Sequence, residues 1–108
     1  IDRNNIQIDG MTEDIMPLEP LKAKYEAFNW HVLEINGHNF EEIVNAFDIA
    51  KAIYEKPVVI IAHNIPGRGI DFMEFSYTWH SKTFKPEEAK ESLNQLRTLG
   101  GKIQSEHQ

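Results

Sequence analysis

The stretch Pro57-Val58-Val59-Ile60-Ile61-Ala62 decides the fold of this chain. Its β-branched residues follow one another without polar alternation, which is typical of a strand covered on both faces, as in a parallel sheet. Pro57 marks the point at which this strand begins. A segment that contains two glycines follows it, from Asn64 to Gly69. The apolar run is far too short to span a membrane.

Upstream of this strand, the sequence predicts alternating strands and helices. Asn39 and Glu42 form a capping box, which predicts that a helix begins at Phe40. Pro20 fits the first turn of an earlier helix, because its missing N–H costs nothing there. The predicted elements are a strand over 1–8, a turn at Asp9-Gly10, a loop over 11–18, a helix over 20–28, a strand over 31–35, a helix over 40–53, the strand over 58–61, an irregular aromatic segment over 72–84, and a helix over 86–99. We expect Ala89, Leu93 and Leu96 of the last helix to face inward. Gly100-Gly101 is expected to end this helix.

This order predicts the α/β class, with a parallel sheet and right-handed crossovers. Three strands form a thin sheet for so much apolar helix surface, so we expect part of a larger doubly wound sheet. Ligands of such sheets bind beyond the carboxyl ends of the strands. Three segments are expected at that edge: 6–10, 37–39 and 63–69.

The composition excludes several functions. The chain has 108 residues, which is one domain at most, and 11 basic against 17 acidic residues give a formal net charge of −6. The basic residues are scattered, which argues against a nucleic-acid or membrane-surface partner. Without cysteine, disulfides and thiolate metal sites are excluded. A cytoplasmic protein is expected. Because Ile1 starts inside an expected strand, we also expect that upstream sequence is missing.

A series of motifs runs through the chain in a fixed order. They are Asp2-Arg3-Asn4-Asn5-Ile6-Gln7-Ile8-Asp9-Gly10, Pro17-Leu18-Glu19-Pro20-Leu21, Ala27-Phe28-Asn29-Trp30-His31-Val32, Ile35-Asn36-Gly37-His38-Asn39-Phe40, Lys56-Pro57-Val58-Val59-Ile60, Ile65 to Glu74, and Trp79-His80. Together, to about Arg97, they resemble the N-terminal subunit of two-subunit transketolases. The resemblance implies that residues 1–108 are the C-terminal part of the diphosphate-type thiamine diphosphate-binding domain. The first half of that family's cofactor motif, Gly-Asp-Gly, does not occur in the chain.

The resemblance implies thiamine diphosphate and a divalent cation, Mg²⁺ or else Ca²⁺ or Mn²⁺, as cofactors. Asn4 would then bind the cation through its side-chain carbonyl and Ile6 through its backbone carbonyl, and oxygen ligands are those that Mg²⁺ prefers. Ile8 would pack against the cofactor. By themselves, Asn4 is an ordinary strand-end residue and Ile8 an ordinary core residue.

His80 is the catalytic candidate of this resemblance. In transketolases the His of a Trp-His-Gly segment lies near the diphosphate and the hydroxyls of the donor sugar, and an imidazole can donate to either or transfer a proton. Ser81 replaces that glycine, and Ser does not reach positive φ freely. Without the resemblance, His80 is a surface histidine beside Trp79. The resemblance assigns Gly67 to a bend that lets the backbone pass close to the cofactor.

Other polar residues are weaker candidates. His63 and Arg68 could face the site, and Asn64 takes the place of a family Thr. His31 and His38 are expected to be structural, since neither has a second metal ligand at useful spacing.

The function implied is a transferase of the pentose phosphate pathway that moves a two-carbon ketol unit between sugar phosphates. Its partners would be a pyrimidine-binding C-terminal transketolase subunit, which carries the general acid–base Glu, and sugar phosphate substrates, in an assembly that is normally a dimer. We expect the 108 residues alone to be inactive. The alternatives are a noncatalytic α/β fragment or assembly module, or another thiamine diphosphate enzyme such as a 1-deoxyxylulose-5-phosphate synthase or a phosphoketolase.

Overall fold

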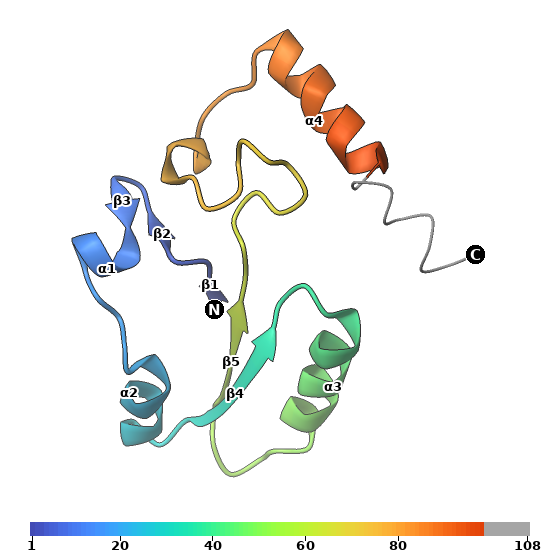
Figure 1. Ribbon diagram of the computed structural model, residues 1–108. Coiled ribbons are helices and arrows are strands. Elements are labelled where there is room, and N and C mark those ends of the chain that lie inside the picture. The colour runs from blue at the N-terminus through green and yellow to red at the C-terminus, as the bar shows by residue number, and fades with distance from the viewer. Residues whose placement is uncertain (99–108) are drawn as a thin grey trace. The chain divides into compact units, whose positions relative to one another are not determined.

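The computed structural model describes residues 1–98, which form two compact units (Figure 1). The first unit comprises 1–5 and 12–64, and the second comprises 6–11 and 65–98 of the described residues. The predicted end of the last helix, at Leu99 to Gly101, lies outside the described residues. No helix among the described residues is long and apolar enough to cross a membrane.

A three-stranded parallel sheet forms the centre of the first unit, in the order β1 (Asp2–Arg3), β5 (Val58–His63), β4 (His31–Asn36). The central strand is the predicted β-branched run, and Val59 and Ile61 are buried in it. Register pairs Asp2 with Ala62 on one side and Ile35 with Ala62 on the other. The α/β class and the parallel sheet are therefore confirmed.

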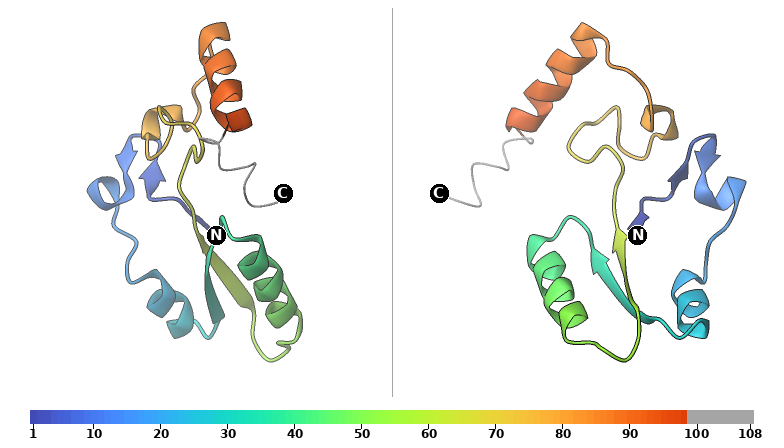
Figure 2. Two further views of the ribbon diagram at one scale, coloured as in Figure 1. Left: turned by 45° about the vertical axis from the view of Figure 1, so that its right-hand side comes forward. Right: turned by 180° about the vertical axis from the view of Figure 1, so that it is seen from behind.

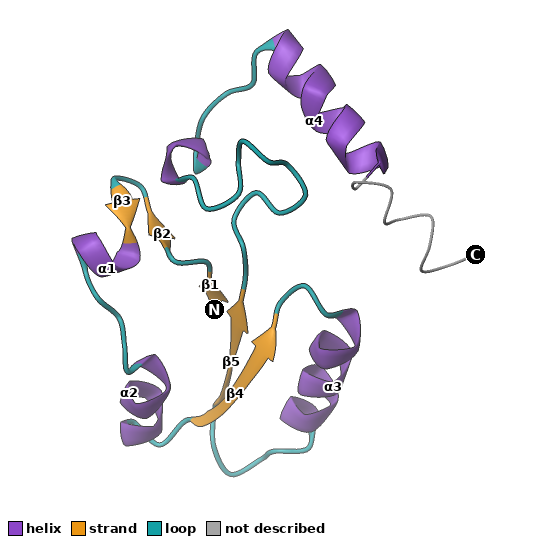
Figure 3. Ribbon diagram, viewed as in Figure 1, coloured by secondary structure: helices purple, strands orange, loops and turns teal. Residues whose placement is uncertain are grey.

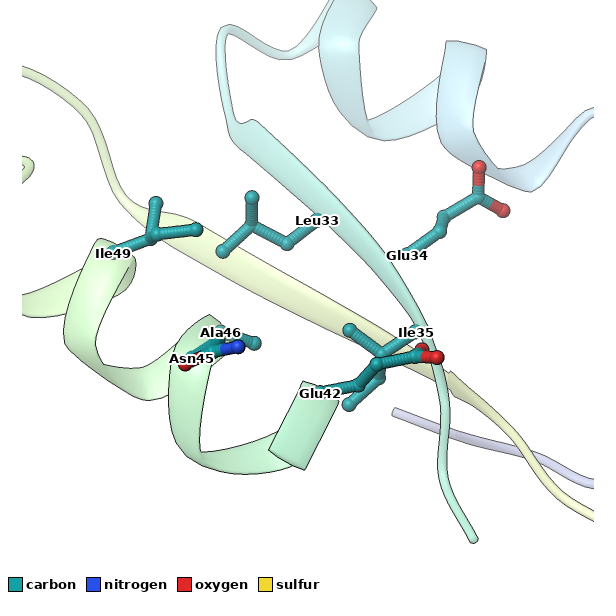
Figure 4. Close-up of a pocket in the computed structure, with 7 residues that line it drawn as sticks. All are labelled: Leu33, Glu34, Ile35, Glu42, Asn45, Ala46 and Ile49. Carbon is teal, nitrogen blue, oxygen red and sulfur yellow. The ribbon is translucent and has the colours of Figure 1, made fainter. Parts of the chain in front are cut away.

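Helices lie on both faces of this sheet (Figures 2 and 3). The connection from β1 to β4 contains α1 (Thr12–Ile15) and α2 (Leu21–Ala27), and α3 (Phe40–Lys51) links β4 to β5. A shallow hollow between α3 and β4 is lined by Leu33, Ile35 and Ala46 among others, whereas Glu34 points away from α3 (Figure 4). Alternation along β4 therefore directs successive side chains to opposite layers.

The capping box that predicts the start of α3 is confirmed in part. Asn39 Oδ1 accepts hydrogen bonds from the backbone N–H groups of Glu41 and Glu42, at 3.0 and 3.3 Å. Glu42 does not complete the box, because its carboxylate accepts from the backbone N–H of Asn36 at 2.7 Å. The Asn39 N–H instead donates to the Asn36 carbonyl. This arrangement fixes the end of β4 to the start of α3.

The prediction of one strand over 1–8 is wrong. The strand ends after Arg3, and Asn5 adopts a left-handed conformation with φ of 64°. Asn tolerates this conformation better than most residues do. The chain then forms an antiparallel hairpin in the second unit, β2 (Ile6–Gln7) with β3 (Gly10–Met11). The predicted loop over 11–18 also contains the short helix α1.

The rest of the second unit consists of a loop, the short 3₁₀ helix η1 (Tyr77–Trp79) and α4 (Pro86–Thr98). Ile70 and Met73 are its buried apolar residues. The prediction that Leu93 and Leu96 face inward is wrong, because they are 53% and 39% exposed. Ser92 is buried in their place, and its hydroxyl donates to the Glu88 carbonyl at 2.7 Å.

Candidate functional site

The carboxyl edge of the parallel sheet brings three polar segments together. The strands end at Arg3, His63 and Asn36, and hydrogen bonds continue the ladder for one more residue. The Asn64 N–H donates to the Arg3 carbonyl at 3.1 Å, and the Gly37 N–H donates to the His63 carbonyl at 3.0 Å. Residues 4, 64 and 37 therefore follow the three strand ends, at the edge where ligands of open parallel sheets bind.

Asp2 links two amide side chains at this edge. Its Oδ2 accepts a hydrogen bond from Asn4 Nδ2 at 3.2 Å, and its Oδ1 accepts one from Asn64 Nδ2 at 2.7 Å. The second bond joins residues that are 62 positions apart in the chain. Asp2 was not a candidate in the sequence, since only the register of β1 against β5 brings it to Asn64.

Gly37 makes room for the Asn64 side chain. A Cβ at position 37 would lie 1.7 Å from Asn64 Oδ1, so no other residue fits without moving that amide. Asn64 Oδ1 is buried and accepts no hydrogen bond from the described residues. Turning the amide over would bring this oxygen against the Asp2 carboxylate, which can only accept. A buried acceptor without a donor is unusual and marks a place where a polar ligand group would be favoured.

The opposite face of the sheet carries a cluster of charges. Arg3 is only 5% exposed, and its guanidinium contacts Glu13 and Glu19 at 3.3 Å each and Asn5 Oδ1 at 2.8 Å. The hydrogen bond from the Leu21 N–H lowers the pKa of Glu19, and the neighbouring Arg3 lowers this pKa further. These contacts hold the turn at Asn5 in place.

His63 and Arg68, the two weaker candidates, occupy different settings. His63 Nε2 lies 3.1 Å from Glu34 Oε1 on the neighbouring strand, and both side chains are partly exposed. Arg68 is exposed on the loop after β5. His63 therefore has a carboxylate partner within the sheet unit.

The hairpin places Ile6 and Ile8 differently. Ile6 is half-buried in β2 opposite Met11, whereas Ile8 lies in the turn and its side chain is 63% exposed. An isoleucine exposed to this extent contributes little to the core of its own unit. The description of Ile8 as core therefore does not hold for the described residues, and its apolar surface is open to contact.

Gly67 lies in a tightly closed loop. Its φ is +72°, and a Cβ there would lie 2.4 to 2.6 Å from Met73 atoms, including the backbone. The loop is closed by a bond from the Phe75 N–H to the Pro66 carbonyl at 3.1 Å and one from the Gly69 N–H to Glu74 Oε1 at 3.0 Å. Glycine is required here by the loop itself.

His80 follows η1 directly, and its side chain is exposed. Its backbone is helical, with φ of −54°, and its N–H donates to the Tyr77 carbonyl at 3.1 Å. Ser81 is not among the described residues with positive φ, so its replacement of glycine causes no backbone strain. Positive φ in this region falls instead on Phe75, at 57°.

Trp79 anchors the backbone beside His80. Its ring packs against Phe72 and Phe84, with centroids 5.2 and 5.3 Å away, and Lys82 Nζ lies 4.2 Å from the ring centroid. Lys82 also contacts Glu88 at 3.5 Å. The indole is thus held from several sides, and this restrains the loop from which the imidazole projects.

The predicted site residues are divided between the two units. Asn4 belongs to the sheet unit, and the others belong to the second unit: Ile6, Ile8, Gly67 and His80. Among the described residues, no three His, Cys, Asp or Glu side chains could hold a metal ion by themselves. The amide oxygen of Asn4 and the carbonyl of Ile6 are uncharged oxygen donors. They would fit a hard cation if its remaining ligands came from phosphate and from outside the described residues.

An open parallel sheet with amide and carboxylate groups at its carboxyl edge defines the class of α/β proteins that bind a cofactor or nucleotide there. Comparison with known proteins makes the class specific. Residues 1–101 match the family described as "Transketolase, thiamine diphosphate binding domain". The chain belongs to this family.

Relatives and solved structures agree with this assignment. The chain is 42% identical to the 6-deoxy-6-sulfo-D-fructose transketolase subunit SqwG of Clostridium sp. (strain MSTE9), over 92% of the chain and 36% of that protein. It is 35% identical to an apulose-4-phosphate transketolase subunit of Phocaeicola vulgatus, over 99% of the chain and 38% of that protein. A transketolase structure from Campylobacter jejuni matches with a TM-score of 0.79 and 35% identity, over 89% of the chain and 15% of that structure. The chain spans little more than a third of the length of these two curated relatives.

Proposed function

We propose that this chain is part of a transketolase that transfers a two-carbon ketol unit between sugar phosphates with thiamine diphosphate and Mg²⁺. The observation that carries the proposal is the family match over 1–101, together with relatives that are named as transketolase subunits. Because the names of these relatives call them subunits, they also support a partner subunit. We infer from the family resemblance that this partner is the pyrimidine-binding subunit and that the assembled enzyme catalyses the reaction.

The metal role is assigned to Asn4 and Ile6. The side-chain oxygen of Asn4 and the backbone carbonyl of Ile6 are two residues apart on either side of the turn at Asn5. They are neutral donors, which would suit a cation that also binds the negatively charged diphosphate. Asn4 and Ile6 would then hold the diphosphate to the protein through that cation. The acidic ligand of the family's Gly-Asp-Gly would have to come from outside these 108 residues.

Ile8 and Gly67 are assigned to cofactor contact. The 63% exposed side chain of Ile8 offers an apolar surface at a hairpin turn, where it would pack against the cofactor. Gly67 lies on the loop that follows the central strand, and the family resemblance assigns it to a bend that would let the backbone pass close to the cofactor. The space at its Cβ position is taken by Met73, so the proposed contact is one of the loop backbone.

His80 is assigned a catalytic role. Its imidazole is exposed next to a restrained Trp79, so the ring is accessible and its backbone is held. An imidazole can donate a hydrogen bond to a sugar hydroxyl or a phosphate oxygen, and it can transfer a proton. When bound, thiamine diphosphate supplies the carbanion chemistry, and the protein supplies binding, orientation and proton transfer.

Reconstitution tests this proposal. The full-length protein with its partner subunit, thiamine diphosphate and Mg²⁺ is expected to convert sugar phosphates, and replacement of Asn4 and His80 by Ala is expected to lower kcat/KM by at least about a hundredfold. The exposed Asp48→Asn variant, on α3, is the control and should keep full turnover. Turnover that survives the double replacement would refute the residue assignments.

A noncatalytic assembly module is the second candidate, for the isolated 108 residues, which contain no Gly-Asp-Gly. Calorimetry of the 108 residues with thiamine diphosphate and Mg²⁺ separates what the isolated chain does from what the assembled enzyme does. We expect little or no binding by the isolated chain and clear binding by the reconstituted enzyme. Absence of binding in both would favour the module. Turnover of a substrate other than a ketose donor by the assembly would point to another thiamine diphosphate enzyme, such as a 1-deoxyxylulose-5-phosphate synthase.

A further inference from the structure

Asp2 lies one row behind the proposed metal ligand on the same face of the sheet. Register pairs Asp2 with Ala62, and side chains two residues further along each strand point to the same side. Asn4 and Asn64 therefore form the next row at the carboxyl edge. Asn64 is thus the diagonal cross-strand neighbour of Asp2, and the Asp2 carboxylate reaches its amide.

The chemistry of Asp2 fixes the orientation of the Asn4 amide. An ionised carboxylate only accepts hydrogen bonds, so a neighbouring amide must present its nitrogen to it. Asn4 Nδ2 lies 3.2 Å from Asp2 Oδ2. The amide oxygen of Asn4 is then the end that points away from Asp2, and oxygen is the atom that a hard cation requires.

Asn64 holds the carboxylate in turn. Its Nδ2 donates to Asp2 Oδ1 at 2.7 Å, which is the shorter of the two bonds. The Asn64 amide lies over Gly37, where a Cβ would collide with its oxygen. The chain of contacts from Gly37 through Asn64 and Asp2 to Asn4 thus runs across all three strands.

We propose that Asp2 is a positioning residue, which holds the Asn4 amide with its oxygen toward the cation and is itself oriented by Asn64. The proposal rests on the proposed function, because it gives Asn4 the metal role. In this proposal Asp2 acts through Asn4, because its two oxygens accept amide hydrogen bonds from Asn4 and Asn64. Groups that orient the ligands of a metal site often change metal affinity when they are replaced.

The experiment measures Mn²⁺ affinity of the full-length protein in the presence of thiamine diphosphate and the partner subunit, from the electron paramagnetic resonance signal of free Mn²⁺. Asp2→Asn keeps the shape of the side chain but puts an amide N–H₂ where one of the two Asn side chains donates. We expect its Mn²⁺ dissociation constant to rise about tenfold. Asp48→Asn changes the same charge on the exposed surface of α3 and should leave the constant unchanged.

A double-mutant cycle distinguishes positioning from other effects. Asn4→Ala should weaken Mn²⁺ binding at least as much as Asp2→Asn does. In the Asn4→Ala background, Asp2→Asn should have no further effect, because no amide remains to be oriented. An equal additional loss in that background would overturn the proposal, since it would mean that Asp2 acts through its charge or through the fold.

The remaining outcomes separate this inference from the proposed function. If Asn4→Ala leaves Mn²⁺ affinity unchanged, the metal role of Asn4 is wrong, and the proposed site is wrong with it. If Asn4→Ala weakens binding and Asp2→Asn does not, the site stands and the positioning role of Asp2 is refuted.

Discussion

Two glycines show how differently the two units of this protein are built. Gly37 lies in the first unit, which contains the sheet, and Gly67 lies in the second, which we call the loop unit. A Cβ at Gly37 would meet the end of the Asn64 side chain, and its backbone angles lie outside the left-handed region. A Cβ at Gly67 would meet the Met73 backbone, and its φ of +72° disfavours any other residue. Gly37 therefore makes room for the Asn64 side chain, which can shift, whereas Gly67 makes room for the Met73 backbone, which cannot.

This difference shows what fixes the positions of the proposed site residues in each unit. At the sheet edge, strand register fixes the backbone, and side chains such as Asp2 and Asn64 are oriented by mutual hydrogen bonds. In the loop unit, the backbone path itself is the fixed element, and the exposed His80 is carried on it. Substitutions should therefore have small, local and compensable effects in the first region and large effects in the second.

The largest effect is expected from Gly67→Ala. The left-handed backbone and the overlap with Met73 together should cost about 3 kcal/mol of local stability. Hydrogen exchange of the Ile70, Met73 and Phe75 amides, which close this loop, measures that loss as a lower free energy of opening. Exchange in β5 should change much less. Unchanged protection of the three loop amides would show that the loop can be rebuilt without its glycine.

A smaller effect is expected from Asn39→Ala, which removes the cap of α3. The side-chain oxygen of Asn39 accepts from two N–H groups, and loss of such a cap costs about 1 kcal/mol. Faster exchange at Glu41 and Glu42 is the measurement. Asn45→Ala, within the same helix, is the matched control and should leave those amides protected. Equal exchange in both variants would contradict the capping role.

Gly37→Ala should cost less than about 1 kcal/mol, because the atom it meets is the far end of a side chain. Thermal unfolding of the full-length protein measures it. Asn64→Ala removes that side chain, so Gly37→Ala should cost almost nothing when Asn64 is already Ala. Additive losses would mean that the sheet edge resists a Cβ through its backbone, as the loop does, and the contrast between the regions would fail.

The smallest effect concerns Glu19 and pH. The Leu21 N–H, followed by Arg3, lowers the pKa of Glu19 below 4.5 in the folded state. A depressed carboxyl pKa stabilises the fold above the unfolded value, and this stability is lost as the pH falls through the folded value. Glu19→Gln should therefore flatten the decline of the melting temperature below about pH 4.5, only slightly because the side chain is 54% exposed. An unchanged acid profile would contradict the shift.

Local patterns in the sequence predict the elements of the sheet unit well. The β-branched run at 58–61 and the cap at Asn39 are local signals, and the structure confirms both. The prediction of a single strand over 1–8 was wrong because Asn5, with positive φ, interrupts the regular alternation. Alternation of apolar and polar residues does not show the sign of φ at any one residue. Leu93 and Leu96 show the same limit, since helical spacing does not say which face of a helix is covered.

The sequence predicts individual residues of the candidate site but not the contacts between them. Asn4, Ile6, Ile8, Gly67 and His80 come from the family resemblance, and their roles remain proposals. The hydrogen bond between Asp2 and Asn64 could not be predicted, because the two residues are 62 positions apart and only the register of β1 against β5 brings them together. The setting of Arg3 was missed for a similar reason, since its two carboxylate partners lie beyond a turn and a short helix.

Cofactor titration of the reconstituted enzyme tests most directly the different roles proposed for Asn4 and His80. Ketol transfer by the Asn4→Ala variant should recover as Mg²⁺ and thiamine diphosphate are raised, because the sheet edge contributes binding. Transfer by His80→Ala should stay slow at saturating cofactor, because the loop contributes proton transfer and sugar contact. Full turnover by His80→Ala at saturation, or cofactor affinity unchanged by Asn4→Ala, would contradict the account.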